Sequence, residues 1–145
     1  MTILPKDIRN IARISKYIFK KYNDEKEINI KNKRYMFCAM IRHKNNHVVG
    51  FNNYVKTHPL TKQIHPRYIL KTHAEIDAIN KWNDSWLITN STTLYTIGLK
   101  PNGDYCTSKP CKSCMETIKE FGIKRIVYCN ALNNNTEFKI SLLNI

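Results

Sequence analysis

The segment THAEIDAI (72–79) combines an apolar helical pattern with two polar side chains at its start. Its apolar residues, among them Ile76 and Ile79, have the spacing of one buried helix face, which predicts a helix that begins at His73. His73 and Glu75 stand two residues apart, and such a pair shares one direction only in a first helical turn. The segment therefore predicts a helix end that presents a histidine and a carboxylate to a pocket.

The flanking segments predict an α/β fold. Two apolar, strand-like segments joined by the turn KNN are typical of a β-hairpin, and proline and glycine are well placed to open and close a helix at Pro110 and Gly122. This order predicts an α/β sandwich around a mixed sheet, as one domain over residues 1–145. The predicted elements are a helix at 4–22, strands at 34–43, 47–55, 92–99 and 124–130, and helices from 73 and from 110; the tail 137–145 is either a helix or an edge strand.

The chain carries 24 basic and 11 acidic residues, a formal charge of +13. Such an excess favours an anionic ligand, either nucleotide phosphates or a nucleic-acid backbone. An A/T-rich coding sequence, which favours Lys, Asn and Ile, explains part of the same excess. The longest apolar run (35–41) is too short to cross a bilayer, and residues 1–10 lack the features of a secretory signal, so we expect a cytoplasmic protein without a membrane partner.

The segment KPCKSC (109–114) contains two of the five cysteines as a C-x-x-C pair. At a helix start the sulfurs of Cys111 and Cys114 lie on one face, where the helix N-terminus favours the thiolate form that binds metals. A catalytic zinc ion takes three protein ligands and leaves one position for water. If the two helix N-termini meet at one end of the sheet, His73 is the third ligand. Cys38 and Cys129 lie in strand-like runs and are interpreted as buried hydrophobic residues.

A catalytic zinc site gives Glu75 a role, whereas a redox dithiol or a closed structural zinc site does not. A carboxylate beside the metal can accept a proton from a zinc-activated water and deliver it elsewhere without binding the metal. Two other interpretations of the cysteines stay open: a redox dithiol, and a closed structural zinc site with Cys106 as the fourth ligand in a binding module without catalysis.

H-A-E at 73–75 followed by P-C-x-x-C at 110–114 resembles the signature of the zinc-dependent cytidine and deoxycytidylate deaminase superfamily. The resemblance covers about residues 34–130. It implies a three-layer α/β/α sandwich with a five-stranded mixed sheet, and Zn²⁺ bound at the N-termini of two central helices. It also implies a homo-oligomer. The segments 50–60 and 103–128 are similar to small viral or phage-type deoxycytidylate deaminases.

Carried over onto this chain, the resemblance implies a role for each matching residue. His73, Cys111 and Cys114 bind zinc, and Glu75 transfers protons. The backbone of Ala74 holds the carbonyl of the base. Asn52 contacts the sugar, although an asparagine that caps a strand end would look the same in sequence.

The expected reaction is hydrolytic deamination of a cytosine nucleotide to the uracil nucleotide and ammonia, with dCMP as the preferred substrate. The loop 54–72 leads directly into His73, and its cations are expected to hold the phosphate. They are Lys56, His58, Lys62, Arg67 and Lys71, with His65 beside them; His58 or His65 could instead bind a second, structural metal.

The main alternative is a deaminase that acts on cytosine, or on adenine, in single-stranded DNA or RNA. The charge of +13 and the aromatic residues Phe51, Tyr54 and Tyr68 near the basic loop suit a single-stranded nucleic-acid partner. Against this interpretation, the basic residues are scattered over the whole chain.

Overall fold

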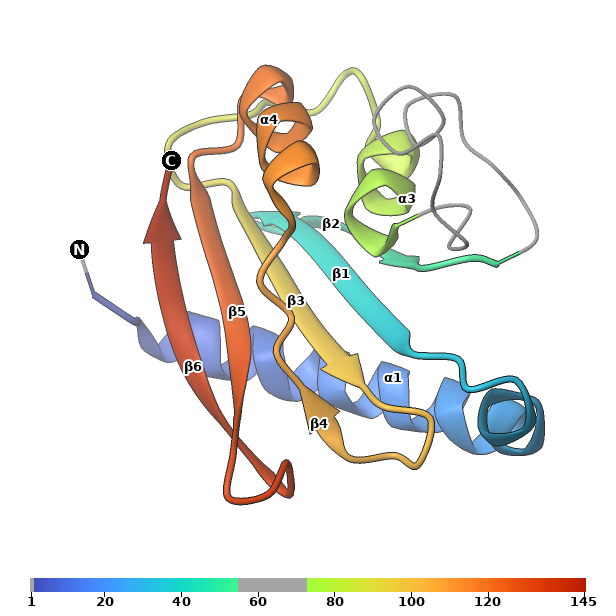
Figure 1. The fold of residues 1–145 in the computed structure, drawn as a ribbon. Helices are drawn as coiled ribbons and strands as arrows, with labels where there is room; N and C mark the ends of the chain where they lie inside the picture. Colours follow the sequence, from blue (N-terminus) through green and yellow to red (C-terminus); the bar gives the residue numbers. More distant parts are fainter. Residues whose placement is uncertain (1, 55–72) are drawn as a thin grey trace.

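The computed structural model describes residues 2–54 and 73–145 of the chain. Within these ranges it contains three α-helices and six β-strands, labelled as in Figure 1. In chain order they are α1 (Pro5–Lys31), β1 (Met36–His43), β2 (Asn46–Phe51), α3 (Ala74–Lys81), β3 (Thr93–Leu99), β4 (Tyr105–Cys106), α4 (Lys112–Phe121), β5 (Arg125–Leu132) and β6 (Glu137–Asn144).

The strands form one mixed sheet in the order β2-β1-β3-β5-β6, with β4 paired to β3 beside this path. β3 and β5 are parallel and are connected through α4, whereas the other pairs are antiparallel. The predicted hairpin of β1 and β2 and the mixed sheet are confirmed, although β2 ends at Phe51, before the predicted end at residue 55. The undecided tail is the edge strand β6. The additional strand β4 lies where only a polar loop was predicted. It has only two residues, which pair with Leu99 and Gly98 of β3.

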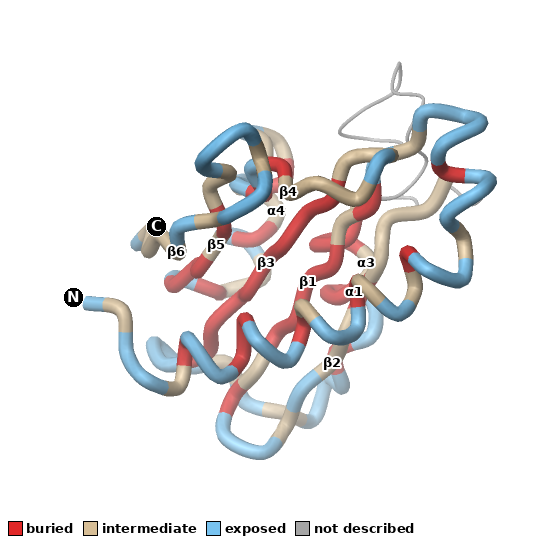
Figure 2. Tube along the Cα trace, turned by 90° about the horizontal axis from the view of Figure 1, so that it is seen from below, coloured by how far each residue is buried: buried red, intermediate tan, exposed pale blue. Residues whose placement is uncertain are grey.

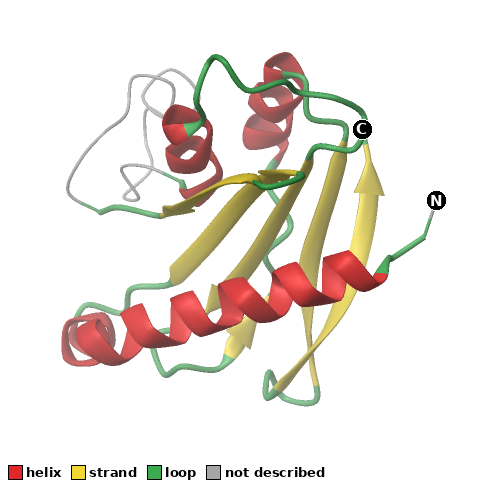
Figure 3. Ribbon diagram, turned by 180° about the vertical axis from the view of Figure 1, so that it is seen from behind, coloured by secondary structure: helices red, strands yellow, loops and turns green. Residues whose placement is uncertain are grey.

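Helices cover both faces of the sheet, α1 on one side and α3 with α4 on the other (Figures 1 and 3). Successive side chains of a strand point to opposite faces, so Met40 of β1 packs in the cluster under α1, and Ile41 packs with α3 and α4. All seven residues of β3 are buried, as the red central trace in Figure 2 shows. The predicted three-layer α/β/α sandwich is confirmed.

The helix α1 is longer than the sequence pattern indicated. It continues to Lys31, and the prediction that it ends at residue 22 is wrong. The apolar pattern fades after Tyr22, but the Glu and Lys residues that follow are good helix formers, and Lys21 pairs with Glu25 one turn further along at 3.4 Å. None of the helices in the described ranges combines the length and the apolar character that crossing a lipid bilayer requires.

A buried ion pair attaches the start of α1 to the sheet. Arg125 of β5 donates hydrogen bonds to both carboxylate oxygens of Asp7, at 2.7 and 2.6 Å, and the Tyr95 hydroxyl of β3 donates a third at 2.8 Å. Burial alone would raise the pKa of Asp7, but these bonds and one from the Leu4 N–H outweigh it and lower the pKa. The pair fixes the position of α1 across the face opposite to α3 and α4.

Candidate active site

His73 stands immediately before α3, with the extended backbone of an N-cap residue. Ala74 and Glu75 follow in the first turn and are buried, at 1% and 7% exposure. The close approach of α3 to β2 depends on Gly50, because a Cβ atom there would lie 2.6 Å from the carbonyl oxygen of Ala74. Strand β2 thus holds the first turn of α3 against the sheet.

The two cysteines of the C-x-x-C pair lie at the start of α4. Cys111 is the N-cap residue, and its sulfur accepts a hydrogen bond from the backbone N–H of Cys114 at 3.5 Å. The prediction that Pro110 opens this helix is wrong by two residues, because the cysteine cap sets the start at Lys112. The helix ends as predicted at Gly122, whose φ of 104° lies in the left-handed region that glycine adopts most easily.

The N-termini of α3 and α4 bring three potential metal ligands together. One ligand atom each of His73, Cys111 and Cys114 lies within 4.8 Å of the others, and the Cys114 sulfur is 3.3 Å from Nδ1 of His73. Zinc binds sulfur at about 2.3 Å and imidazole nitrogen at about 2.0–2.1 Å, so ligands of one ion stand within about 4 Å of each other. The donor types and spacing of this group fit zinc, with a fourth position left for water.

Hydrogen bonding within the group moves the pKa values of the two thiols in opposite directions. The hydrogen bond from the Cys114 thiol, aided by His73, lowers the pKa of Cys111 to about 3 despite burial. The same bond, together with burial and the nearby charge of Glu75, raises the pKa of Cys114. The lowered pKa of Cys111 favours its thiolate, which is the form that binds a metal.

The carboxyl of Glu75 is buried beside the metal-ligand group. Burial raises the pKa of its carboxyl above the ordinary value, and the charge of His73 offsets only part of this effect. A carboxyl group whose pKa is moved toward neutrality gives and takes a proton more readily in physiological conditions. Glu75 has the environment expected of a general acid and base.

A cavity of about 160 Å³ opens beside these residues. Its volume is close to the roughly 150 Å³ that holds one benzene ring in an engineered protein cavity, so a single pyrimidine ring fits. Four of the residues that line it belong to the two motifs: His73, Ala74, Glu75 and Cys111. Sequence reasoning did not include the other lining residues, which are Phe37, Thr107, Ser108 and Lys109.

The signal for three of these additional residues was their position, since 107–109 directly precede the P-C-x-x-C motif. Ser108 is buried, and its hydroxyl bonds to backbone atoms of Thr96 and Cys129, so it fixes the path of this segment over β3 and β5. Lys109 is exposed and brings a cation to the edge of the cavity. The sequence identifies Phe37 only as part of a predicted strand and gives no sign that it lines a cavity.

Asn52 lies at the end of β2, where its amide binds the backbone of the neighbouring strand. Its Oδ1 accepts from the Phe37 N–H at 2.7 Å, and its Nδ2 donates to the Tyr35 carbonyl at 2.9 Å. This is the capping role that the sequence allowed, and contact with a sugar stays a prediction. The loop cations Lys56, His58, Lys62, His65, Arg67 and Lys71 lie outside the described residues.

Cys106 is separate from the metal-ligand group. Its sulfur lies against the backbone of Gly98, and burial raises its pKa to about 11. In the described part of the chain, the group of metal-ligating atoms consists of His73, Cys111 and Cys114. A closed site with Cys106 as fourth ligand finds no support in this arrangement. Cys38 and Cys129 are fully buried, as predicted.

Comparison with known proteins agrees with this geometry. Residues 13–130 match the family model described as the cytidine and deoxycytidylate deaminase zinc-binding region. The match covers most of the chain, which therefore belongs to the cytidine and deoxycytidylate deaminase family. No curated protein and no solved structure matches the chain significantly. Membership of this family and the His-Cys-Cys group together support zinc-dependent hydrolytic deamination of a small nucleotide, with Zn²⁺ as the cofactor.

Proposed function

We propose that this protein converts a cytosine nucleotide to the uracil nucleotide and ammonia, with dCMP as its preferred substrate. The observation that carries the proposal is the position of Glu75, buried beside the His73, Cys111 and Cys114 group at a cavity with room for one pyrimidine ring. The family match supports the same chemistry.

His73, Cys111 and Cys114 would hold the zinc ion between the two helix N-termini. When bound there, zinc supplies Lewis-acid activation that lowers the pKa of a water molecule toward neutrality. The two cysteines are placed by the first turn of α4 and the histidine by the start of α3. Both helices pack on the same face of the sheet, which would hold the three ligands in position before a substrate binds.

Glu75 would carry the protons of the reaction. Its carboxylate accepts a proton from the attacking water as the new C4–O bond forms, and delivers this proton to N3 of the ring. A second proton from the same water passes through Glu75 to the amino nitrogen, after which the C4–N bond breaks and ammonia leaves. One water is consumed, and the base that remains is uracil.

The first turn of α3 would orient the base. The backbone N–H groups of a first helical turn have no partner within the helix and can bind an acceptor outside it. Ala74 lies in this turn and lines the cavity, so its N–H is suited to the base carbonyl. Lys109 at the edge of the same cavity favours a phosphorylated substrate over a nucleoside.

A substrate panel tests the proposal. Zinc-loaded protein is incubated with cytidine, deoxycytidine, CMP, dCMP, dCTP and a cytosine-containing oligonucleotide, and formation of the uracil product and ammonia is followed. We expect the highest kcat/KM with dCMP. Conversion of the oligonucleotide alone would assign the activity to a polynucleotide substrate, and no conversion of any compound would refute the proposed reaction.

A further inference from the structure

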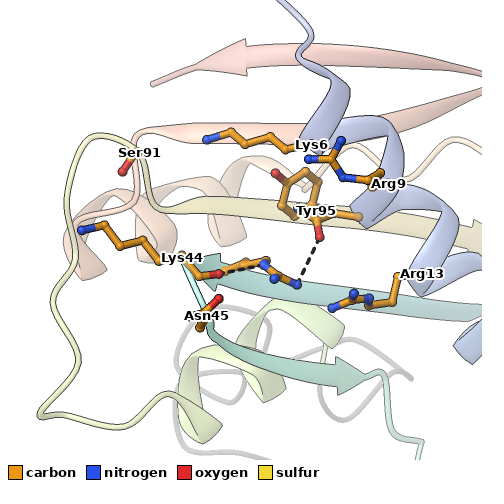
Figure 4. A pocket seen from close by; sticks show the side chains of 9 residues that line it. Lys6, Arg9, Arg13, Lys44, Asn45, Ser91 and Tyr95 are labelled. Carbon is orange, nitrogen blue, oxygen red and sulfur yellow. Dashed lines mark hydrogen bonds between the residues drawn. The ribbon is translucent and has the colours of Figure 1, made fainter.

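A second pocket lies under the N-terminal half of α1, at the turn between β1 and β2. Its volume is about 370 Å³, and five cations line it: Lys6, Arg9, Arg13, Arg42 and Lys44. In Figure 4, side chains from α1 border the pocket on one side, and Lys44 and Asn45 of the turn border it on the other. Cations that lie far apart in sequence thus converge on one concave surface.

The central sheet separates this pocket from the candidate active site. Helix α1 covers one face of the sheet, and α3 and α4, which carry His73 and Cys111, cover the other (Figures 1 and 3). The basic pocket and the cavity beside His73 therefore lie on different sides of the sheet. The basic pocket is thus distinct from the candidate active site.

The described residues form no ion pair that balances the positive charge of the pocket. In the described ranges, the ion pairs are Lys21–Glu25, Lys81–Asp77 and Arg125–Asp7, and none of them involves a cation of this pocket. Asp7, the acidic residue adjacent to Lys6, is fully buried and is bound by Arg125 and Tyr95. A bound anion would supply the missing negative charge.

The arrangement of the cations is unfavourable without such an anion. Arg9 is followed four residues later by Arg13 and preceded three residues earlier by Lys6, and like charges at these helical spacings repel each other. Lys6 also lies in the first turn of α1, where the helix dipole disfavours a cation. Both costs are relieved when a polyanion binds between these side chains.

Arg42 is already oriented for such a ligand. Its Nε donates to the Lys44 carbonyl at 2.9 Å, and its Nη1 is 3.4 Å from Oδ1 of Asn10. These bonds hold the guanidinium at the pocket and leave further N–H groups of its five donors for an oxyanion. A planar guanidinium fixed in this way suits two oxygens of one phosphate group.

We propose that this pocket binds a compact small molecule that carries two or more linked phosphate groups. The volume lies in the range of about 300–1,000 Å³ that is typical of small-molecule sites. Single-stranded nucleic acid is a weaker fit, because its binding sites combine cations with exposed aromatic rings. Tyr95, the aromatic residue that lines the pocket, is 1% exposed and donates its hydroxyl to Asp7.

Isothermal titration of the zinc-loaded protein with inorganic tripolyphosphate tests this proposal. The double substitution Arg9→Gln/Arg13→Gln removes two exposed pocket cations, and Lys16→Gln/Lys26→Gln removes the same charge from exposed positions of α1 outside the pocket. We expect one binding site in the wild type, an affinity weakened by about tenfold or more in the pocket variant, and a much smaller change in the control. Lys44→Gln removes a pocket cation of the turn between β1 and β2 and should also weaken tripolyphosphate binding.

A parallel titration uses oligothymidylate, which contains no cytosine to deaminate. Absence of tripolyphosphate binding, or equal weakening in the pocket and control variants, would overturn the proposal. A loss of oligothymidylate binding in the pocket variant with tripolyphosphate affinity unchanged would overturn it too, and would assign the surface to nucleic acid. Because binding is measured directly, the result does not depend on the proposed deaminase activity.

Discussion

The Sγ atom of Cys114 lies 3.3 Å from Nδ1 of His73, although 41 residues separate them in the chain. The contact joins the first turn of α4 to the start of α3, and both helices rest on the same face of the sheet. At this contact the two sequence motifs form one group of potential zinc ligands.

Glu75→Gln is expected to keep zinc and to lose most of its turnover. The amide has nearly the same shape but cannot accept and release a proton, and general acid–base catalysis contributes about 10²- to 10⁴-fold to a rate. Glu116→Gln, an exposed position of α4, is the matched control. The measurement is kcat together with bound zinc per chain. A Glu75→Gln variant as active as the control would refute the role of Glu75.

Gly50→Ala is expected to disturb the metal site from a distance. The added Cβ would meet the backbone nitrogen of Ala78 and lie 2.6 Å from the carbonyl oxygen of Ala74, so α3 must move. Overpacking of this kind costs about 1–3 kcal/mol in the free energy of unfolding, and we also expect weaker zinc binding because His73 moves with the helix. Denaturant titration and competition with a zinc chelator measure the two effects.

His47→Ala, at an exposed position of the same strand, is the control for Gly50→Ala. His47→Ala should change neither the free energy of unfolding nor the zinc affinity appreciably. Equal stability and zinc affinity for Gly50→Ala and His47→Ala would show that the approach of β2 to α3 does not position the metal ligands.

Asp7→Asn is expected to destabilise the fold by about 3–5 kcal/mol. Arg125 is 4% exposed and Asp7 is fully buried, and the substitution leaves a buried guanidinium without its counter-charge. Asp24→Asn, on an exposed part of α1, is the control and should lie close to the wild type. Denaturant titration gives the free energy of unfolding. A difference below about 1 kcal/mol between the two variants would contradict the anchoring role of this pair.

The same ion pair predicts part of the pH dependence of stability. Because folding lowers the pKa of Asp7, the stabilisation is complete above the ordinary value of 3.8 and is lost as the pH falls through the lowered pKa. Asp7→Asn should remove this component, so that the stability of the variant falls less steeply in acid. Identical acid profiles of the variant and the wild type would contradict the assignment.

Lys109→Gln tests how the substrate phosphate is recognised. If this cation contacts the phosphate, its loss should raise KM for dCMP by about tenfold and leave KM for deoxycytidine unchanged. Lys112→Gln removes an exposed cation that does not line the cavity and serves as the control. Equal changes for the nucleotide and the nucleoside would exclude a phosphate contact at Lys109.

Much of the fold was predictable because local chemistry determined it. Two apolar, strand-like segments joined by a short turn predicted the hairpin of β1 and β2, and the glycine at 122 predicted the end of α4; the structure confirms both. The end of α1 was missed because an exposed helix beyond the core keeps no apolar period, only favourable residues such as Glu25 and Lys26. Strand β4 is too short to leave any pattern in the sequence.

The candidate active site and the basic pocket differ in how far the sequence alone predicts them. His73, Cys111 and Cys114 stand in compact motifs whose residue types are rare in combination, so their convergence could be predicted. The basic pocket brings together α1 and the turn after β1, and its cations look like any other exposed lysine or arginine in sequence. Only the packing of α1 across the sheet makes them neighbours.

Zinc K-edge X-ray absorption of the zinc-loaded protein tests the central claim most directly. We predict two sulfur ligands at about 2.3 Å, one imidazole nitrogen at about 2.0–2.1 Å and one light ligand from solvent. Cys106→Ser should leave this pattern unchanged, whereas Cys114→Ser should lose a sulfur or the metal. Three sulfur ligands in the wild type, or a sulfur lost in Cys106→Ser, would contradict an open site formed by His73, Cys111 and Cys114.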